Sequence, residues 1–113
     1  MAIMAVAFPI APGKTEDWRR FVGELKGARH AEYIASRKGL GLRERTFLQA
    51  TPMGDLVIVT LEGDNPGQAF GRFVNATDPF TLWFLERVKE VHGIDLKHAA
   101  LGPSPELVVD SAG

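Results

Sequence analysis

The first hydrophobic run of the chain, residues 3–10, is apolar at its even and at its odd positions. Successive side chains of a strand point to opposite faces, so this pattern predicts a strand that is covered on both faces. Pro9, Pro12 and Gly13 end the run. It is short, and no Lys or Arg precedes it, so we interpret it as a strand rather than a secretory signal and expect a cytoplasmic protein.

A helical pattern follows, with Thr15 as its candidate N-cap and an apolar stripe at Trp18, Phe21, Val22 and Leu25. Beyond Gly27 the same helical spacing no longer places apolar residues on this face. If the helix continues unchanged, its buried face carries Arg29, Glu32, Tyr33 and Ser36. If the helix bends near Gly27, the buried face is reset to Ala28, Ala31, Ile34 and Ala35. We expect the bend and the reset, because the second set is apolar.

A β-hairpin is predicted next, with strands at residues 42–51 and 55–62 and a turn at Pro52-Met53-Gly54. The first strand is mostly polar, which is typical of a sheet edge. The second is apolar on both faces, which favours a central position in the sheet.

Two further helical segments are predicted, because Thr77-Asp78-Pro79 restarts the helical pattern. Asp64 or Asn65 is the candidate cap of the first, with Pro66 at its first position. Their apolar stripes are Ala69, Phe70, Phe73 and Val74 in the first, and Phe80, Trp83, Phe84, Val88 and Val91 in the second. Gly93 ends the second, and residues 107–109 form a short last strand.

The predicted order βαββαβ is that of a ferredoxin-like α+β domain spanning residues 1–113. Right-handed crossovers give a four-stranded antiparallel sheet in the order 4-1-3-2, with both helical regions on one face. The other face would expose apolar residues of strands 1 and 3. Several hundred Å² of such surface left in water would cost on the order of 10 kcal/mol. We therefore expect a homodimer that packs sheet against sheet. A C-terminal loop folded across that face is the alternative cover.

Composition narrows the classes of partner. The chain has 13 Lys and Arg against 14 Asp and Glu, with a formal net charge of −1 and no basic block. This balance argues against nucleic acid or an anionic membrane as the main partner. The chain has no cysteine, which excludes disulfides, thiolate metal sites and a cysteine nucleophile. No segment has the apolar length that a membrane-spanning helix needs.

Two stretches resemble small proteins of the dimeric α+β barrel superfamily. They are Ser36-Arg37-Lys38-Gly39-Leu40-Gly41, running into residues 48–55, and Asp78-Pro79-Phe80 with Trp83-Phe84 and His92-Gly93. The superfamily includes cofactor-free monooxygenases, haem-binding and haem-degrading proteins, and many small proteins without an assigned activity. The resemblance implies a dimeric barrel. It selects no enzyme branch, so no catalytic role is transferred, and we expect no cofactor.

The first candidate cluster lies on the predicted first helix. His30, Tyr33 and Arg37 are spaced i, i+3, i+7 and so share one side of the helix. An imidazole, a phenol and a guanidinium together can bind or protonate an oxygen-rich substrate. The structural alternative is a solvated helix face.

The hairpin supplies a second candidate. With a three-residue turn, Glu44 would lie opposite Glu62, where two carboxylates can act as a general base or a weak metal site. Phe47 and Gln49 would share the opposite face with Val57 and Val59, where the glutamine amide can orient a ligand. Solvated glutamates and a glutamine that binds the backbone at a sheet edge are the structural alternatives.

Two more candidates lie on the last helix. Trp83 would line a pocket or belong to the core. His92 in the final turn is favoured there by the helix dipole, and it is also a candidate axial haem ligand. His98 has no evident partner. The three histidines lack the spacings of zinc sites, so no metal is expected.

Three functions stay open. The first is a small-molecule-handling protein, with monooxygenase-like or isomerase-like activity on a planar or aromatic compound. The second is a dimeric ligand-sensing or interaction module without catalysis. The third is haem binding through His30 or His92. Ligand contacts are expected among His30, Tyr33, Arg37, Glu44, Phe47, Gln49, Trp83 and His92.

Overall fold

The computed structural model describes residues 1–98 and 105–113 and shows three strands and four helices. Their order along the chain is β1 (Ala2–Pro9), α1 (Thr15–Lys26), α2 (His30–Leu40), β2 (Arg43–Thr51), β3 (Gly54–Gly63), α3 (Pro66–Val74) and α4 (Pro79–His92). The α+β class is confirmed, as are the breaks that the sequence predicts near Gly27 and before Asp78.

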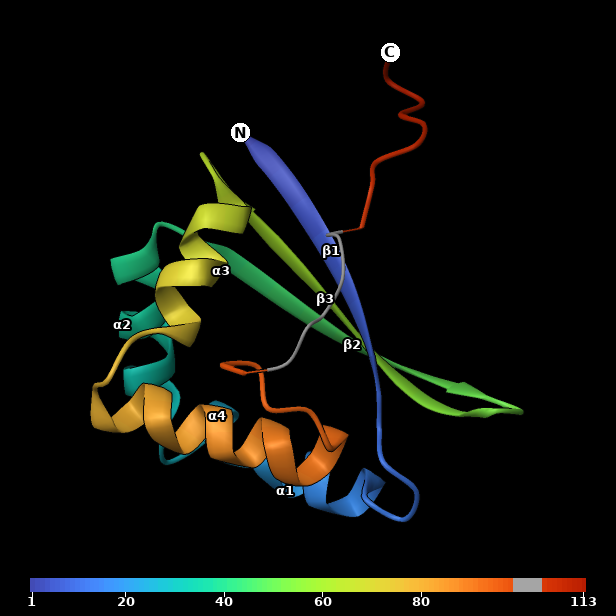
Figure 1. The fold of residues 1–113 in the computed structure, drawn as a ribbon, viewed down its shortest axis with the longest axis vertical. Coiled ribbons are helices and arrows are strands. Elements are labelled where there is room, and N and C mark those ends of the chain that lie inside the picture. The colour runs from blue at the N-terminus through green and yellow to red at the C-terminus, as the bar shows by residue number, and fades with distance from the viewer. Residues whose placement is uncertain (99–104) are drawn as a thin grey trace.

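The sheet has three antiparallel strands in the order β1-β3-β2. The predicted neighbours of the apolar third strand are therefore confirmed. The predicted fourth strand is not: Leu107, Val108 and Val109 belong to no strand, and their exposed fractions are 68%, 83% and 81%. This C-terminal segment stands away from the body of the protein (Figure 1). Three residues without a neighbouring strand leave their backbone groups to water, so they stay outside the sheet.

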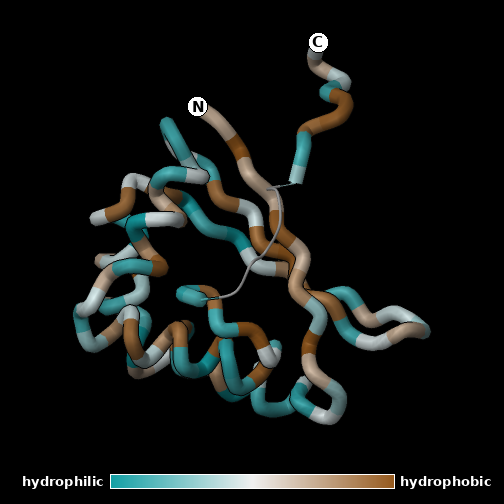
Figure 2. The backbone as a smooth tube through the Cα atoms, viewed as in Figure 1, coloured by the Kyte–Doolittle hydropathy of each residue, from teal (hydrophilic) through white to brown (hydrophobic). Residues whose placement is uncertain are grey.

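All four helices cover the same face of the sheet, which we call the inner face (Figure 1). Hydrophobic residues recur along the strands and along the helices (Figure 2). The core contains Trp18, Phe21 and Leu25 of α1, Val57 of β3, and Phe80, Val88 and Val91 of α4. The apolar stripes that the sequence predicts for α1, α3 and α4 are the ones that face this core.

The opposite side, which we call the outer face, is open in the single chain. Its residues include Ile3, Ala5 and Ala7 of β1, Phe47 of β2 and Ile58 of β3. Ile3 is 53% exposed and Phe47 is 54% exposed. The expected apolar residues of β1 and β3 therefore lie on this face, beside polar ones such as Arg45 and Glu62, and none of the described residues covers it fully.

The hairpin register differs by one residue from the predicted register. Thr51 pairs with Gly54, so the turn has two residues, Pro52 and Met53, rather than three. Gly54 has a φ of +119°, which a residue with a side chain rarely adopts. A shift of one residue moves every side chain of a strand to the other face. The predicted pair of Glu44 with Glu62 is therefore wrong, because Glu44 pairs with Leu61.

The expected reset of the buried helix face beyond Gly27 is also wrong. Ile34 is 43% exposed, while Tyr33 is half-buried and Arg37 is only 6% exposed. The chain does break between α1 and α2, but the face of α2 that turns inward is the polar one. Arg37 tolerates burial because its guanidinium is ion-paired and lies against aromatic rings, as described below.

Side chains cap two of the four helices. Asn65 accepts a hydrogen bond from the backbone N–H of Gln68 and caps α3, as predicted. Asp78 accepts one from the N–H of Thr81 and caps α4. Thr15 is not a cap: its hydroxyl donates to the Asp55 carboxylate at 2.7 Å and joins α1 to β3.

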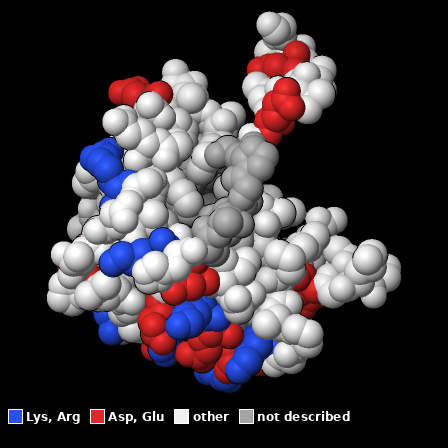
Figure 3. Space-filling view, viewed as in Figure 1, with Lys and Arg blue, Asp and Glu red and all other residues white. Residues whose placement is uncertain are grey.

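Acidic and basic side chains are intermixed on the surface over α1 and α4, as Figure 3 shows. Arg87 and Glu90, for example, form an ion pair of 3.4 Å on α4. Among the described residues, no helix is long and apolar enough to cross a membrane.

Candidate functional site

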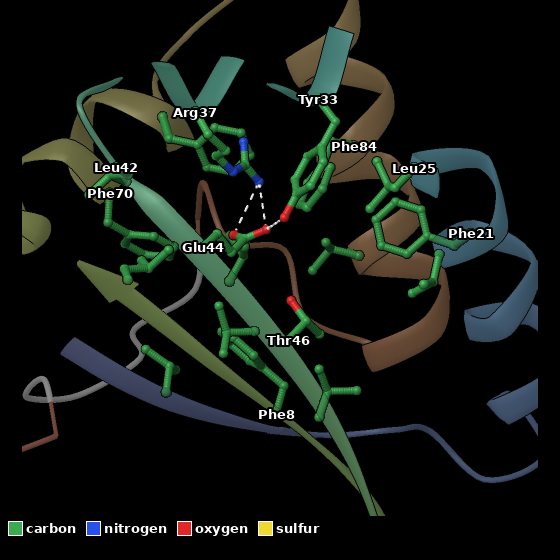
Figure 4. A pocket seen from close by; sticks show the side chains of 18 of the residues that line it. Phe8, Phe21, Leu25, Tyr33, Arg37, Leu42, Glu44, Thr46, Phe70 and Phe84 are labelled. Carbon is green, nitrogen blue, oxygen red and sulfur yellow. Dashed lines mark hydrogen bonds and ion pairs between the residues drawn. The ribbon is translucent and has the colours of Figure 1, made fainter. Parts of the chain in front are cut away.

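A cavity of about 280 Å³ lies between the inner face of the sheet and the helices. Its walls are mainly apolar and come from both layers. Val6 and Phe8 of β1 and Val57, Val59 and Leu61 of β3 form the sheet side; Trp18, Phe21, Leu25, Phe70, Phe73 and Phe84 are among the helical contributions. Figure 4 shows apolar side chains, among them Phe8, Phe21, Leu25, Phe70 and Phe84, around a small group of polar ones.

The polar group consists of Tyr33 and Arg37 from α2 and Glu44 from β2, and we call it the polar cluster. The Tyr33 hydroxyl donates to Oε2 of Glu44, and Nη2 of Arg37 lies 3.3 Å from Oε1 of the same carboxylate. Both contacts are drawn in Figure 4. Tyr33 and Arg37 come together because they are one helical turn apart, as their spacing predicts.

The polar cluster is withdrawn from water. The side chains of Arg37 and Glu44 are 8% and 10% exposed. Burial raises the pKa of Tyr33 well above its usual range, and the neighbouring Glu44 carboxylate adds to this rise. The phenol therefore stays protonated at any physiological pH and acts as a hydrogen-bond donor to Glu44.

Aromatic rings surround the guanidinium of Arg37. Its central carbon lies 4.6 Å from the ring centre of Phe73, 4.8 Å from that of Phe84 and 5.0 Å from that of Tyr33. Nη1 donates to the hydroxyl of Ser36 at 2.9 Å. Cation–π contacts and the Glu44 pair together compensate a buried charge, which explains how the polar cluster persists beside an apolar cavity.

His30 and His92 also line the cavity. Nδ1 of His30 lies 3.1 Å from the carbonyl oxygen of Leu25, and Nδ1 of His92 lies 2.9 Å from that of Pro9. A carbonyl oxygen accepts and cannot donate, so Nδ1 carries the proton in both rings. Burial lowers the pKa of His92, which favours its neutral form.

Three predicted contact residues lie outside the cavity. Phe47 and Gln49 pair with Ile58 and Leu56 on the outer face, not with Val57 and Val59 as expected. The indole of Trp83 stacks beneath the guanidinium of Arg29 at 4.2 Å and packs against Phe21, so it belongs to the core. Five of the eight candidates therefore line the cavity: His30, Tyr33, Arg37, Glu44 and His92.

Several lining residues were not among the sequence candidates, notably Trp18, Phe8 and Thr46. The spacing of Trp18 and Phe8 along the sequence predicts that they are buried. It does not tell whether a buried side chain lines a cavity or packs in a filled core. Thr46 points toward the cavity two residues beyond Glu44 (Figure 4). The correct two-residue turn would have placed Glu44 and Thr46 together on the inner face.

No metal site is apparent in the part of the chain that the structure describes: it contains no group of three or more His, Asp or Glu side chains arranged to hold an ion. Glu62, the expected carboxylate partner of Glu44, is instead paired with Arg45 on the outer face. His98, for which no partner was expected, lies with Nδ1 2.9 Å from Oδ2 of Asp95.

The site thus combines an apolar cavity with a buried, charge-compensated polar cluster at its wall. Such a site can enclose the apolar body of a small molecule and orient one polar atom by hydrogen bonding. Comparison with family models, curated proteins and solved structures gives no match for this chain.

Proposed function

We propose that the protein binds a small, mainly apolar molecule in the cavity between the sheet and the helices, with Tyr33, Arg37 and Glu44 contacting its polar end. The observation that carries this proposal is the buried polar cluster beside an otherwise apolar cavity. Burying charged and polar groups is costly, and apolar residues of similar volume often stabilise a core equally well or better. Convergent polar groups in an apolar pocket are typical of ligand sites.

The dimensions and the lining favour a compact aromatic ligand. Ligand pockets usually measure about 300–1,000 Å³, so a cavity of about 280 Å³ suits a compound of one or two rings. The rings of Phe8, Phe21 and Phe84 offer faces and edges against which a planar molecule can pack. A ligand-sensing protein and an enzyme acting on such a compound would both use this pocket.

Filling the cavity tests the proposal. Val59 faces the cavity, whereas its neighbour Ile58 faces the outer side of the same strand. Amide NMR shifts in a titration with 2-methoxynaphthalene, a two-ring probe without a hydrogen-bond donor, should map to the cavity. We expect Val59→Phe to weaken binding about tenfold or more by occupying the space. Ile58→Phe, the matched control, should bind as the unaltered protein does. Absence of binding of both this probe and its hydroxyl analogue 2-naphthol to the unaltered protein would contradict the proposal.

We also propose that a second copy of the chain covers the outer face, as in the dimeric α+β barrel proteins that the sequence resembles. Ile3 and Phe47 are more than half exposed, and Ala5 and Ala7 are small enough for two sheets to approach closely. An exposed apolar sheet face is a typical protein-interaction surface. A self-complementary patch needs no other partner and forms a symmetric dimer.

Light scattering tests the dimer. The unaltered chain should have twice the monomer mass of 12.3 kDa at micromolar concentration. Phe47→Lys should reduce the mass to that of one chain, because a buried ammonium group opposes sheet packing. Met53→Lys, in the turn at 98% exposure, is the matched control and should stay dimeric. A monomeric unaltered protein, still cooperatively folded, would refute the dimer.

A further inference from the structure

The polar cluster has no net charge, although it contains two ionised groups. Arg37 and Glu44 neutralise each other at 3.3 Å, and three aromatic rings surround the guanidinium. An anionic ligand that approached Arg37 would also approach the Glu44 carboxylate. Because both charges are buried, the repulsion from Glu44 would offset the attraction to Arg37. The polar cluster is therefore poorly suited to a carboxylate or a phosphate.

Two members of the polar cluster, Tyr33 and Glu44, keep acceptor positions that can receive a donor from a ligand. Tyr33 uses its one O–H on Glu44, which leaves the phenolic oxygen as an acceptor. An ionised carboxylate has about four acceptor positions, and Tyr33 with Nη2 of Arg37 accounts for part of them. Arg37 has five N–H donors; Nη1 donates to Ser36 and Nη2 to Glu44, and three aromatic rings lie against the guanidinium.

The histidines in the cavity wall have the same bias. In His30 and His92, Nδ1 is the donor to a backbone carbonyl, so Nε2 of the neutral ring is an acceptor. Three lining residues outside the polar cluster also carry donors. The Thr46 hydroxyl can donate as well as accept, and Trp18 carries an indole N–H. Lys26 is exposed, so its charge is solvated.

From this inventory we infer that the polar end of the ligand is an uncharged hydrogen-bond donor, such as a phenolic or alcoholic hydroxyl or an N–H group, which binds to Glu44 and the Tyr33 oxygen. This inference rests on the proposed function and specifies the ligand class of the same cavity. It predicts that ligands with the same ring system but different polar groups bind with different affinities. An aromatic alcohol should be preferred to its ether and to its carboxylate.

Three probes of one ring system test the inference: 2-naphthol, 2-methoxynaphthalene and 2-naphthoate at pH 7. We expect 2-naphthol to bind at least about tenfold more tightly than the ether, because a hydrogen bond to a charged acceptor is worth about this much or more. Binding of 2-naphthoate should be weaker than that of both. Amide NMR titrations give the three dissociation constants.

Two variants test whether Glu44 is the residue that causes the preference for 2-naphthol. In Glu44→Gln the compensating charge is lost, so the preference for 2-naphthol should fall to within about threefold of the ether, while 2-naphthoate gains affinity from the unpaired Arg37. Glu62→Gln removes a glutamate of the same sheet from the outer face and should change none of the three constants. If Glu44→Gln does not fold, the comparison of the three probes on the unaltered protein still decides the inference.

The outcomes separate this inference from the proposed function. Equal binding of 2-naphthol and the ether, or tightest binding of 2-naphthoate, would overturn the inference and leave the cavity as a ligand site. Failure of all three probes to bind would overturn both, because the ligand class has no meaning without an occupied cavity.

Discussion

Gly63 shows how a single residue couples β3 to the segment between α2 and β2. It ends β3 and is buried. A Cβ atom placed on Gly63 would lie 2.6 Å from the carbonyl oxygen of Gly41 and 3.1 Å from Cδ2 of Leu42. The first neighbour is backbone and cannot rotate away. The segment that leads into Glu44 therefore packs against Gly63 at a distance that a side chain would not allow.

We predict that Gly63→Ala lowers the free energy of unfolding by about 1–3 kcal/mol through this overlap. Gly23→Ala is the matched control, because Gly23 lies inside α1 with nothing within 4 Å of an added Cβ. It should stabilise the protein by about 0.5–1 kcal/mol through helix propensity. Urea unfolding followed by circular dichroism measures both. An unchanged Gly63→Ala stability would show that the backbone at Gly41 can move.

At the scale of elements, α4 depends on its cap. The Asp78 carboxylate accepts hydrogen bonds from the backbone N–H of Thr81 at 3.1 Å and from its hydroxyl at 2.7 Å. The Thr81 hydroxyl is the largest cause that lowers the pKa of Asp78. The cap places Phe80 and Thr81 in the core at the start of a helix that also supplies Phe84 to the cavity.

We predict that Asp78→Ala lowers the free energy of unfolding at pH 7 by about 0.5–2 kcal/mol, the usual cost of losing a cap. Glu86→Ala, an exposed substitution inside α4, should change it by no more than about 0.5 kcal/mol. The folded-state pKa of Asp78 is lowered, so its contribution is present above the unfolded-state value and is lost as the pH falls through the folded value. The difference between Asp78→Ala and the unaltered protein should therefore shrink at acidic pH in urea titrations.

At the scale of the whole molecule, His92 ties the end of α4 to the end of β1, which are 83 residues apart along the chain. Its Nδ1 donates to the Pro9 carbonyl, and its ring lies 5.5 Å from that of Phe8. Burial is the main cause that lowers the pKa of His92, and the Pro9 hydrogen bond partly opposes it. The contact joins the helical layer to the sheet beside the cavity.

We predict that protonation of His92 destabilises the fold. The unfolded state binds the proton more readily, so the unfolding free energy decreases as the pH falls through about 6.5, the ordinary histidine value, toward the lower folded-state pKa. His92→Gln should have a smaller decrease over the same interval. Urea titrations from pH 8 to pH 5 measure the slopes. Identical slopes for His92→Gln and the unaltered protein would contradict the prediction.

Local patterns were sufficient for most elements, because their causes are local. The apolar stripe of α1, the break near Gly27 and the restart of the helical pattern at Thr77-Asp78-Pro79 all follow from residues within one or two helical turns. The central position of β3 follows from its two apolar faces. The spacing of His30, Tyr33 and Arg37 also placed three members of the site on one helix side.

Tertiary contacts decided the rest. Arg37 faces inward only because Glu44 of β2 and the rings of Phe73 and Phe84, from α3 and α4, receive it. Glu44 and Thr46 reach the cavity because the turn has two residues, a choice between closely similar turns that reverses every side chain of the strand. The apolar pattern showed which residues leave water, but their packing determined where about 280 Å³ stays unfilled. Periodicity reports burial, whereas a cavity depends on how separate elements meet.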